Sequence, residues 1–343
     1  MERILDFAAL RLNLDPVEIR RRNLLKPEDF PYHTGLTDLD ETKVVYDSGD
    51  YSACLDRTLE LIDYKNFPLE QSRAERAGRR IGIGVACYST MTGRGPFEGA
   101  RVRCAPDGRV FVHSGVASTG QGHETTLAQI CAEHLGVRFS DVVVKNGDTD
   151  DIEKSIGTYA ARVVVMAGNA VAMAARSVRE KALAHAAKIF NVCESDLKIV
   201  NGVIQVAAAP ERSTTFGAVA RCLSAQAEQL PASERAATEL EATSYFQCNR
   251  PAYANGTYAA VVEVNTATGV VKILRHALAH DCGVRVNPRV VDGQIYGGVA
   301  QGIGEILCEE VRYDKTGKPL TSSFKDLPLA KRYAGATTDS RTS

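Results

Sequence analysis

The sequence predicts an α+β fold, because short strands joined by tight turns are interleaved with helices instead of following a doubly wound strand–helix repeat. Two turns support this prediction, Pro106-Asp107-Gly108 and Asn201-Gly202, since each separates two short runs rich in β-forming residues. A third observation is the alanine-rich stretch 163–190, which has the length and composition of one long helix. At 343 residues, the chain has room for one large two-lobed domain or for two smaller domains.

The first part of the chain is expected to combine helices with a long loop. Apolar residues at helical spacing over 4–25 predict a helical start, with a second short helix beginning at Pro16. Residues 27–51 are rich in Pro, Gly, Asp and Tyr without periodicity, which predicts an extended loop, and a further helix is expected over 55–64. Residues 1–70 are therefore expected to form a helical and loop segment that continues a domain begun upstream.

A first lobe is expected over residues 80–206. Its expected strands cover residues 81–87, 99–104, 110–114 and 142–145, its expected helices cover 125–135 and 163–190, and a hairpin is expected over 197–206. The order of these elements again favours mixed helices and sheets over a parallel sheet.

A second, incomplete lobe is expected over residues 207–326. In this lobe, residues 258–264 are expected to pair with 270–279 across a turn that ends in glycine, and a glycine-spotted helix is expected over 290–310. Residues 327–343 have a polar, unpatterned composition, so we expect an atypical tail there.

Charge and cysteine content argue against several classes of protein. Forty-one Lys and Arg against forty-two Asp and Glu give a net charge of -1, which disfavours a nucleic-acid groove or a surface for anionic membranes. The nine cysteines are scattered without C-x-x-C spacing, so the sequence predicts neither a disulfide framework nor a metal or iron–sulfur site in this chain. Neither a membrane span nor a signal peptide is evident, so a soluble cytoplasmic protein is expected.

Three glycine-containing segments are candidates for ligand binding. The first is Ser118-Thr119-Gly120-Gln121-Gly122-His123-Glu124-Thr125-Thr126, between an expected strand and an expected helix. Two glycines around a glutamine let backbone N–H groups approach an anionic or heteroaromatic ligand, and the glutamine amide both donates and accepts hydrogen bonds. The alternative is an ordinary helix cap made by Thr125 or Thr126.

The second segment, Gly157-Thr158-Tyr159-Ala160-Ala161-Arg162, begins the long helix, where free N–H groups and the helix dipole favour a phosphate. An ordinary helix start is the alternative, and Tyr159 either lines a pocket or packs in the core. The third segment runs from Asp292 through Gln294 to Glu305. Each of its glycines costs about 1 kcal/mol relative to alanine in a helix, which indicates a close approach to another group.

Together, the three segments resemble the molybdopterin-binding region of the xanthine dehydrogenase/aldehyde oxidase family of molybdenum hydroxylases. Further similar stretches are Asp15-Pro16-Val17-Glu18-Ile19-Arg20-Arg21-Arg22-Asn23-Leu24, Tyr46-Asp47-Ser48-Gly49-Asp50-Tyr51 and His280-Asp281-Cys282-Gly283. The resemblance covers about residues 1–326. It implies a two-lobed cofactor-binding domain of mixed sheets and helices, truncated, from the large subunit of such an enzyme.

The resemblance also implies which residues bind the cofactor. By position, Gln121 and Gln294 hydrogen-bond the pterin or its phosphate-bearing arm. Backbone amides around Gly122 and His123 and over residues 158–162 would add further hydrogen bonds to it. The implied cofactor-binding set is Gln121, Gly122, His123, Thr158, Tyr159, Ala161, Arg162 and Gln294. The implied cofactor is molybdopterin with molybdenum, with or without a cytosine dinucleotide, and iron–sulfur clusters and FAD are expected on partner chains or domains.

The resemblance implies no catalytic residue and no metal ligand within these 343 residues. The family's catalytic glutamate lies in a Gly-x-Gly-Glu motif beyond the end of this chain, and Gly302-Ile303-Gly304-Glu305 only imitates that motif. We therefore expect Glu305 on a helix surface or in helix packing. Ala160 and Ala161 also depart from the family, in which relatives often carry Gly-Ser.

The function implied for the parent protein is hydroxylation of an aldehyde or a purine-like N-heterocycle with oxygen from water. Its partners would be a small-molecule substrate and, in a hetero-oligomer, iron–sulfur and FAD subunits, without nucleic acid or membrane. This chain alone is expected to be inactive. The alternative is a non-catalytic truncated remnant that keeps only pterin contacts.

Overall fold

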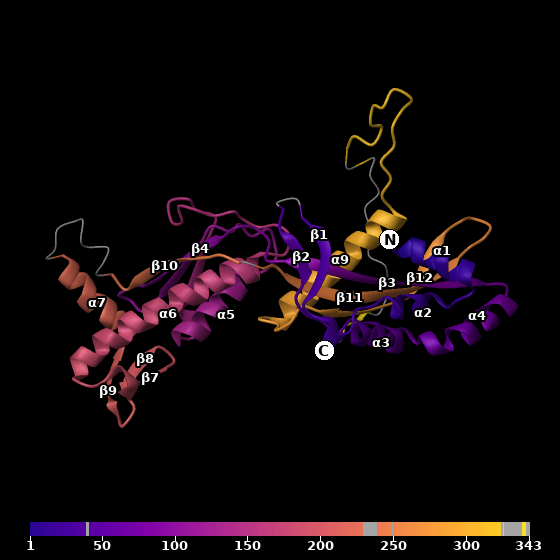
Figure 1. The fold of residues 1–343 in the computed structure, drawn as a ribbon. Helices are drawn as coiled ribbons and strands as arrows, with labels where there is room; N and C mark the ends of the chain where they lie inside the picture. The colour runs from indigo at the N-terminus through magenta and orange to yellow at the C-terminus, as the bar shows by residue number, and fades with distance from the viewer. Residues whose placement is uncertain (39–40, 229–238, 249, 324, 326–337, 341–343) are drawn as a thin grey trace. The chain divides into compact units, whose positions relative to one another are not determined.

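The chain folds into two compact units in a computed structural model that describes residues 1–38, 41–228, 239–248, 250–323, 325 and 338–340 (Figure 1). Unit 1 combines Met1–Thr90 with Ala252–Ser343, and unit 2 is Met91–Pro251. Neither unit coincides with the expected lobes, 80–206 and 207–326. The difference arises because a strand from the second half of the chain lies beside a strand from the first half in the sheet of unit 1. Most of the expected tail lies outside the described residues.

Unit 2 is built on a four-stranded sheet in the order β10-β4-β5-β6. Its strands are β4 (Glu98–Cys104), β5 (Val110–Ser114), β6 (Val142–Asn146) and β10 (Glu241–Phe246), and its helices are α5 (His123–Leu135), α6 (Val163–Phe190) and α7 (Phe216–Ala227). A second sheet consists of β7 (Leu197–Val200), β8 (Val203–Val206) and β9 (Ala209–Thr215). β5 and β6 are parallel because α5 provides the crossover between them, whereas β4 is antiparallel to both its neighbours.

The core of unit 2 lies between this sheet and helix α6, which also packs against α5 (Figure 1). The side of α6 that is buried carries small side chains, including Ala167, Ala170 and Ala174, all fully buried. Small residues let the helix backbone come close to its neighbours, so α6 packs against valines such as Val102 and Val112 of the sheet. This packing fixes the two loops that precede α5 and α6.

Unit 1 contains a second four-stranded sheet, in the order β13-β12-β11-β3. Its strands are β3 (Arg80–Thr92), β11 (Ala252–Val264), β12 (Val271–Asp281) and β13 (Thr338–Ser340), with β1 (Tyr32–Thr37) and β2 (Lys43–Tyr46) as a separate ladder. Its helices are α1 (Glu2–Leu12), α2 (Pro16–Arg21), α3 (Tyr51–Ile62), α4 (Phe67–Arg76) and α9 (Pro288–Leu307). Leu55 and Ile62 of α3 join the core cluster formed with Val85 and Val261 of the sheet.

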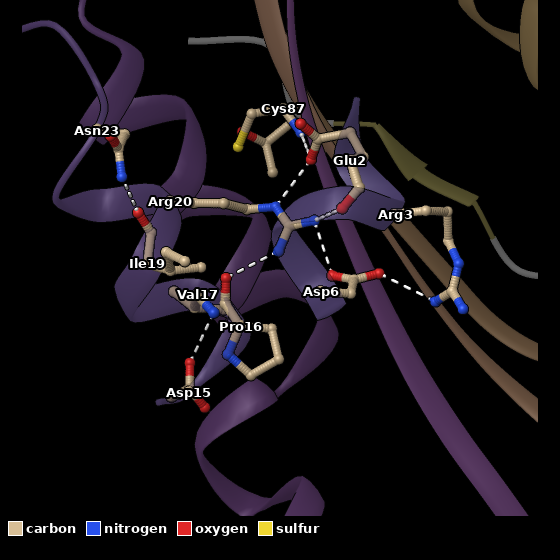
Figure 2. A network of polar contacts seen from close by, with 11 residues as sticks. Glu2, Arg3, Asp6, Asp15, Pro16, Val17, Ile19, Arg20, Asn23 and Cys87 are labelled. Atoms are coloured by element: carbon tan, nitrogen blue, oxygen red, sulfur yellow. Dashed lines mark hydrogen bonds and ion pairs between the residues drawn. The ribbon is translucent and has the colours of Figure 1, made fainter. Parts of the chain in front are cut away.

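A buried arginine ties the first two helices to this sheet (Figure 2). Arg20 of α2 is only 1% exposed and donates to the Glu2 and Asp6 carboxylates at 2.8 and 2.9 Å. It also donates to the Pro16 carbonyl. The Glu2 carboxylate in turn accepts from the backbone N–H of Cys87 in β3 at 3.0 Å. One side chain therefore joins α1, α2 and the sheet.

Most of the predicted elements are confirmed, but several were missed or misread. The extended loop predicted over 27–51 is wrong, since this stretch contains β1 and β2. All but one residue of β1 are exposed, so the apolar alternation that signals a strand is absent there. Four further elements, α4, β9, α7 and β10, were not predicted from the sequence.

Several of the free thiols lie in the core. All nine cysteines are unpaired, and burial raises the pKa of Cys54 to about 11 and of Cys104 to about 12. None of the described helices is long and apolar enough to cross a membrane. Within the part of the chain that the structure describes, no group of three or more His, Cys, Asp or Glu side chains is placed to hold a metal ion.

Burial also makes the stability of the protein sensitive to mild acid. Burial lowers the pKa of six histidines: His113, His123, His134, His185, His276 and His280. The unfolded chain takes up these protons near pH 6.5, whereas the folded chain binds them only at lower pH. We therefore expect the free energy of unfolding to fall as the pH drops from about 7 to 5.

Urea denaturation at a series of pH values measures this dependence. In His276→Phe, one of the shifted histidines is removed, so the decline between pH 7 and 5 should be shallower than in the wild type. A wild-type free energy of unfolding that stayed constant or rose over this range would contradict the prediction.

Candidate functional site

The first glycine segment forms a tight loop before α5. Gly120 and Gly122 have φ of 104° and 74°, which favours glycine. The side chain of Gln121 closes the loop by accepting from the Thr119 N–H at 2.7 Å and donating to the Thr119 hydroxyl at 2.9 Å. A Cβ added at Gly120 would meet no atom within 4 Å, so the loop borders open space.

The alternative that a threonine caps this helix is wrong. Gly122 is the N-cap of α5, without a side-chain cap bond, and Thr126 lies inside the helix, where its hydroxyl donates to the Gly122 carbonyl. The first turn of α5 therefore keeps backbone N–H groups that no side-chain cap satisfies, and such groups attract anions.

His123 is buried at the start of α5. Its side chain is 5% exposed, and its Nδ1 has no hydrogen-bond partner among the residues that the structure describes. Burial lowers the pKa of His123, so its imidazole is neutral at pH 7. A buried polar atom without a protein partner can accept or donate a hydrogen bond to a water molecule, an ion or a ligand.

The second glycine segment forms an unusual turn before α6. Gly157 has a φ of 94°, and the non-glycine residues Ala160 and Ala161 have φ of 45° and 51°. Each alanine in this left-handed region costs about 1–2 kcal/mol. Such strain occurs mainly at functional sites, where the surrounding structure over-determines the backbone.

Two hydrogen bonds in unit 2 involve these segments, one from each of them to a neighbouring residue. The Thr158 hydroxyl donates to the Ala117 carbonyl at 2.6 Å, and the Asn146 amide donates to the Glu124 carboxylate at 3.3 Å. The Thr158 bond thus holds the second segment beside Ala117, the residue that directly precedes the first segment. Seven of the eight implied site residues, all except Gln294, belong to unit 2.

Arg162 and Tyr159 differ in their exposure. The Arg162 guanidinium is fully buried and pairs with the equally buried Glu98 carboxylate. Tyr159 is 43% exposed, and the Arg162 guanidinium carbon lies 5.3 Å from the centre of its ring. Tyr159 is therefore not packed in the core, and Arg162 presents no charged head to solvent. Glu98 was not predicted as a site residue, because a single charged residue at the start of a mostly buried strand is a weak signal.

Gln294 belongs to the other unit. It is exposed on α9, as are Gly293 and Gly297, at which an added Cβ would meet no atom within 4 Å. Its partnership with the two loops of unit 2 stays a prediction. Glu305 is also exposed on α9, which agrees with its expected place on a helix surface.

The two loops have the chemistry to hold an anionic, heteroaromatic group. They offer the N-terminal ends of α5 and α6, whose dipoles favour a phosphate, and the Gln121 amide, which can both donate and accept. The unpartnered Nδ1 of His123 adds a neutral polar contact. A phosphate-bearing pterin has the matching acceptors and donors, so the residues present fit it.

Comparison with known proteins gives the family. Residues 57–331 match the family described as the molybdopterin cofactor-binding domain. The chain belongs to this family. The resemblance stated from the sequence is thereby confirmed, as is the α+β class.

Two similar proteins are enzyme large subunits of more than twice this length. The chain is 33% identical to the carbon monoxide dehydrogenase large chain of Afipia carboxidovorans, over 96% of this chain and 42% of that one. It is 34% identical to the nicotine 6-hydroxylase large subunit of Paenarthrobacter nicotinovorans, over 95% and 40%. The chain thus spans under half the length of both relatives.

Solved structures agree with this assignment. A crystal structure of Cu,Mo-CO dehydrogenase matches all of this chain, and 44% of its own, with a TM-score of 0.85 and 31% identity. Quinoline 2-oxidoreductase from Pseudomonas putida 86 matches 98% of this chain, and 43% of its own, with a TM-score of 0.84 and 34% identity.

Proposed function

We propose that this chain provides cofactor-binding loops to a molybdenum-dependent hydroxylase that oxidises an aldehyde or a purine-like N-heterocycle. One observation supports this most: the Thr158 hydroxyl donates to the Ala117 carbonyl, which holds the left-handed turn before α6 beside the chain that leads into the left-handed turn before α5. The names of the similar proteins, nicotine 6-hydroxylase and quinoline 2-oxidoreductase, support an N-heterocyclic substrate.

The proposal includes a cofactor and partners. The cofactor is molybdopterin with molybdenum, carried as the free pterin or as its cytosine dinucleotide. Iron–sulfur and FAD subunits would take up the electrons, in a hetero-oligomer. The designations "large chain" and "large subunit" of the relatives support an assembly of several chains.

In this proposal, the residues of the chain bind and orient. When bound, the cofactor supplies the metal-centred oxidation that places oxygen from water on the substrate carbon. Gln121 presents an amide whose hydrogen bonds to Thr119 hold it in one orientation. His123 stays neutral because it is buried, so it can donate or accept one hydrogen bond without adding charge. The first turns of α5 and α6 present N–H groups to a phosphate.

Replacing Gln121 by alanine is expected to weaken pterin binding by about 5- to 150-fold, because a polar edge left unpaired in a buried site costs about 1–3 kcal/mol. Gln294→Ala tests whether the Gln294 amide of unit 1 also hydrogen-bonds the pterin. The measurement is the pterin bound per molecule of the complete subunit, produced in a host that makes molybdopterin. Released pterin is oxidised and quantified by its fluorescence, and molybdenum is measured by mass spectrometry.

Gln226→Ala is the matched control, since Gln226 is exposed on α7. It should bind as much pterin as the wild type. Full pterin content in the Gln121→Ala, Gln294→Ala double variant would overturn the roles assigned to both glutamines. A wild-type complex that binds pterin but oxidises no aldehyde or N-heterocycle would support the non-catalytic alternative.

A further inference from the structure

We infer that the buried Glu98–Arg162 pair is a positioning device that holds the strained turn 157–162 in its cofactor-binding shape. The inference rests on the proposed function, since it assigns the pair a task only if this turn binds the pterin. It also separates Arg162 from direct cofactor contact. Arg162 would act through the backbone of the turn and not through its own charge.

The guanidinium of Arg162 forms its hydrogen bonds within the protein. It donates to the carbonyls of Arg94, Phe97 and Gly157, each at 2.6 Å, and to the Glu98 carboxylate. Four of its five N–H groups are thereby used. Because the side chain is also fully buried, its guanidinium cannot form a bidentate ion pair with a phosphate.

Glu98 completes the device from the other side. One of its carboxylate oxygens accepts from the N–H groups of Ile156 and Gly157, at 3.3 and 3.2 Å, as well as from Arg162. Glu98 stands at the first position of β4, so it anchors the turn to the central sheet. The two side chains together hold the start of the turn at Gly157 and its end at Arg162.

The strain inside the turn explains why such a device is required. Ala160 and Ala161 both have left-handed φ, which L-residues rarely adopt, and they directly precede Arg162. Arg162 itself returns to the right-handed region, with φ of -90° and ψ of -21°. A left-handed residue followed by a right-handed one turns successive N–H groups toward a common point, which suits an anion. Without the pair, the alanines would relax to a less strained shape.

Arg162→Lys tests this directly, because lysine keeps the charge but cannot make four hydrogen bonds in a fork. We expect at least about tenfold faster hydrogen exchange at the amides of residues 156–162, while α6 stays protected. Bound pterin per folded complete subunit should fall by about tenfold as well. The matched control is Arg20→Lys in unit 1, where a similarly buried arginine binds two carboxylates. It should leave pterin content unchanged.

A second pair of substitutions separates positioning from general structural support. Glycine adopts left-handed φ without penalty, so Ala160→Gly with Ala161→Gly lowers the strain that the pair has to hold. Added to Arg162→Lys, these changes should restore pterin binding by about fivefold. A merely structural arginine would not be rescued by glycine at two exposed turn positions.

The outcomes distinguish this inference from the proposed function. If the wild-type subunit binds no pterin, the proposed function fails. If the wild type binds pterin and Arg162→Lys binds equally well with unchanged exchange at 156–162, the positioning role is overturned. Loss of pterin in Arg162→Lys without any rescue by the two glycines would also overturn it, in favour of direct contact or general stability.

Discussion

Replacing Glu98 by alanine is expected to lower the free energy of unfolding of unit 2 by about 3–5 kcal/mol, since it leaves the buried Arg162 charge without a counter-ion. Both side chains are fully buried, so water cannot take over the lost contact. The N–H groups of Ile156 and Gly157 lose their acceptor at the same time. Urea denaturation followed by circular dichroism measures the change, because α6 contributes strongly to the helical signal.

The control for this substitution is Glu133→Ala, at an exposed position of α5. Surface substitutions of this kind change stability by about 0.5 kcal/mol or less. If Glu98→Ala is as stable as this control, the ion pair contributes nothing to the fold. Such a result would also contradict the positioning role, which requires a strong pair.

Replacing Arg20 by methionine is expected to lower the stability of unit 1 by about 3 kcal/mol, near the lower end of the range for breaking a buried pair. The lower end applies because the Glu2 and Asp6 carboxylates are 30% and 29% exposed, so water partly solvates them once Arg20 is gone. Their mutual repulsion then loosens α1 from the sheet (Figure 2). Hydrogen exchange of the amides of residues 1–25 measures the loosening.

Arg22→Met provides the comparison on the same helix end. Arg22 is 59% exposed and pairs with Glu18 one turn earlier, so its loss should cost about 0.5 kcal/mol or less. Equal protection of residues 1–25 in Arg20→Met and Arg22→Met would refute the proposed difference between the buried and the exposed arginine.

Much of the fold could be predicted because local signals were strong. The helix expected over 163–190 has the same bounds as α6, since its alanine content and the preceding turn both mark it. The hairpin at Asn201-Gly202 also forms as expected, with positive φ at both residues. By contrast, β10 pairs with β4 from more than 130 residues away, and no local pattern records such a long-range partner.

In the candidate site, too, local features were predictable from the sequence and long-range contacts were not. The loops around Gln121 and Thr158 were visible because glycine and helix starts are local features. The role of Glu98 was invisible, because it depends on an arginine 64 residues further along the chain. The left-handed φ of Ala160 and Ala161 could not be predicted either, because alanine rarely adopts this conformation.

The pairing of β10 with β4 has a consequence for how such a protein can be assembled from parts. Unit 2 enters through β4 and leaves through β10, which are antiparallel neighbours, with Glu98 opposite Phe246. In unit 1, the strands on either side of this excursion, β3 and β11, are also neighbours. Unit 2 is thus an insertion whose two ends lie about one strand spacing apart, roughly 5 Å. A module with adjacent ends can be gained, exchanged or lost between two strands while the host sheet keeps its pairing.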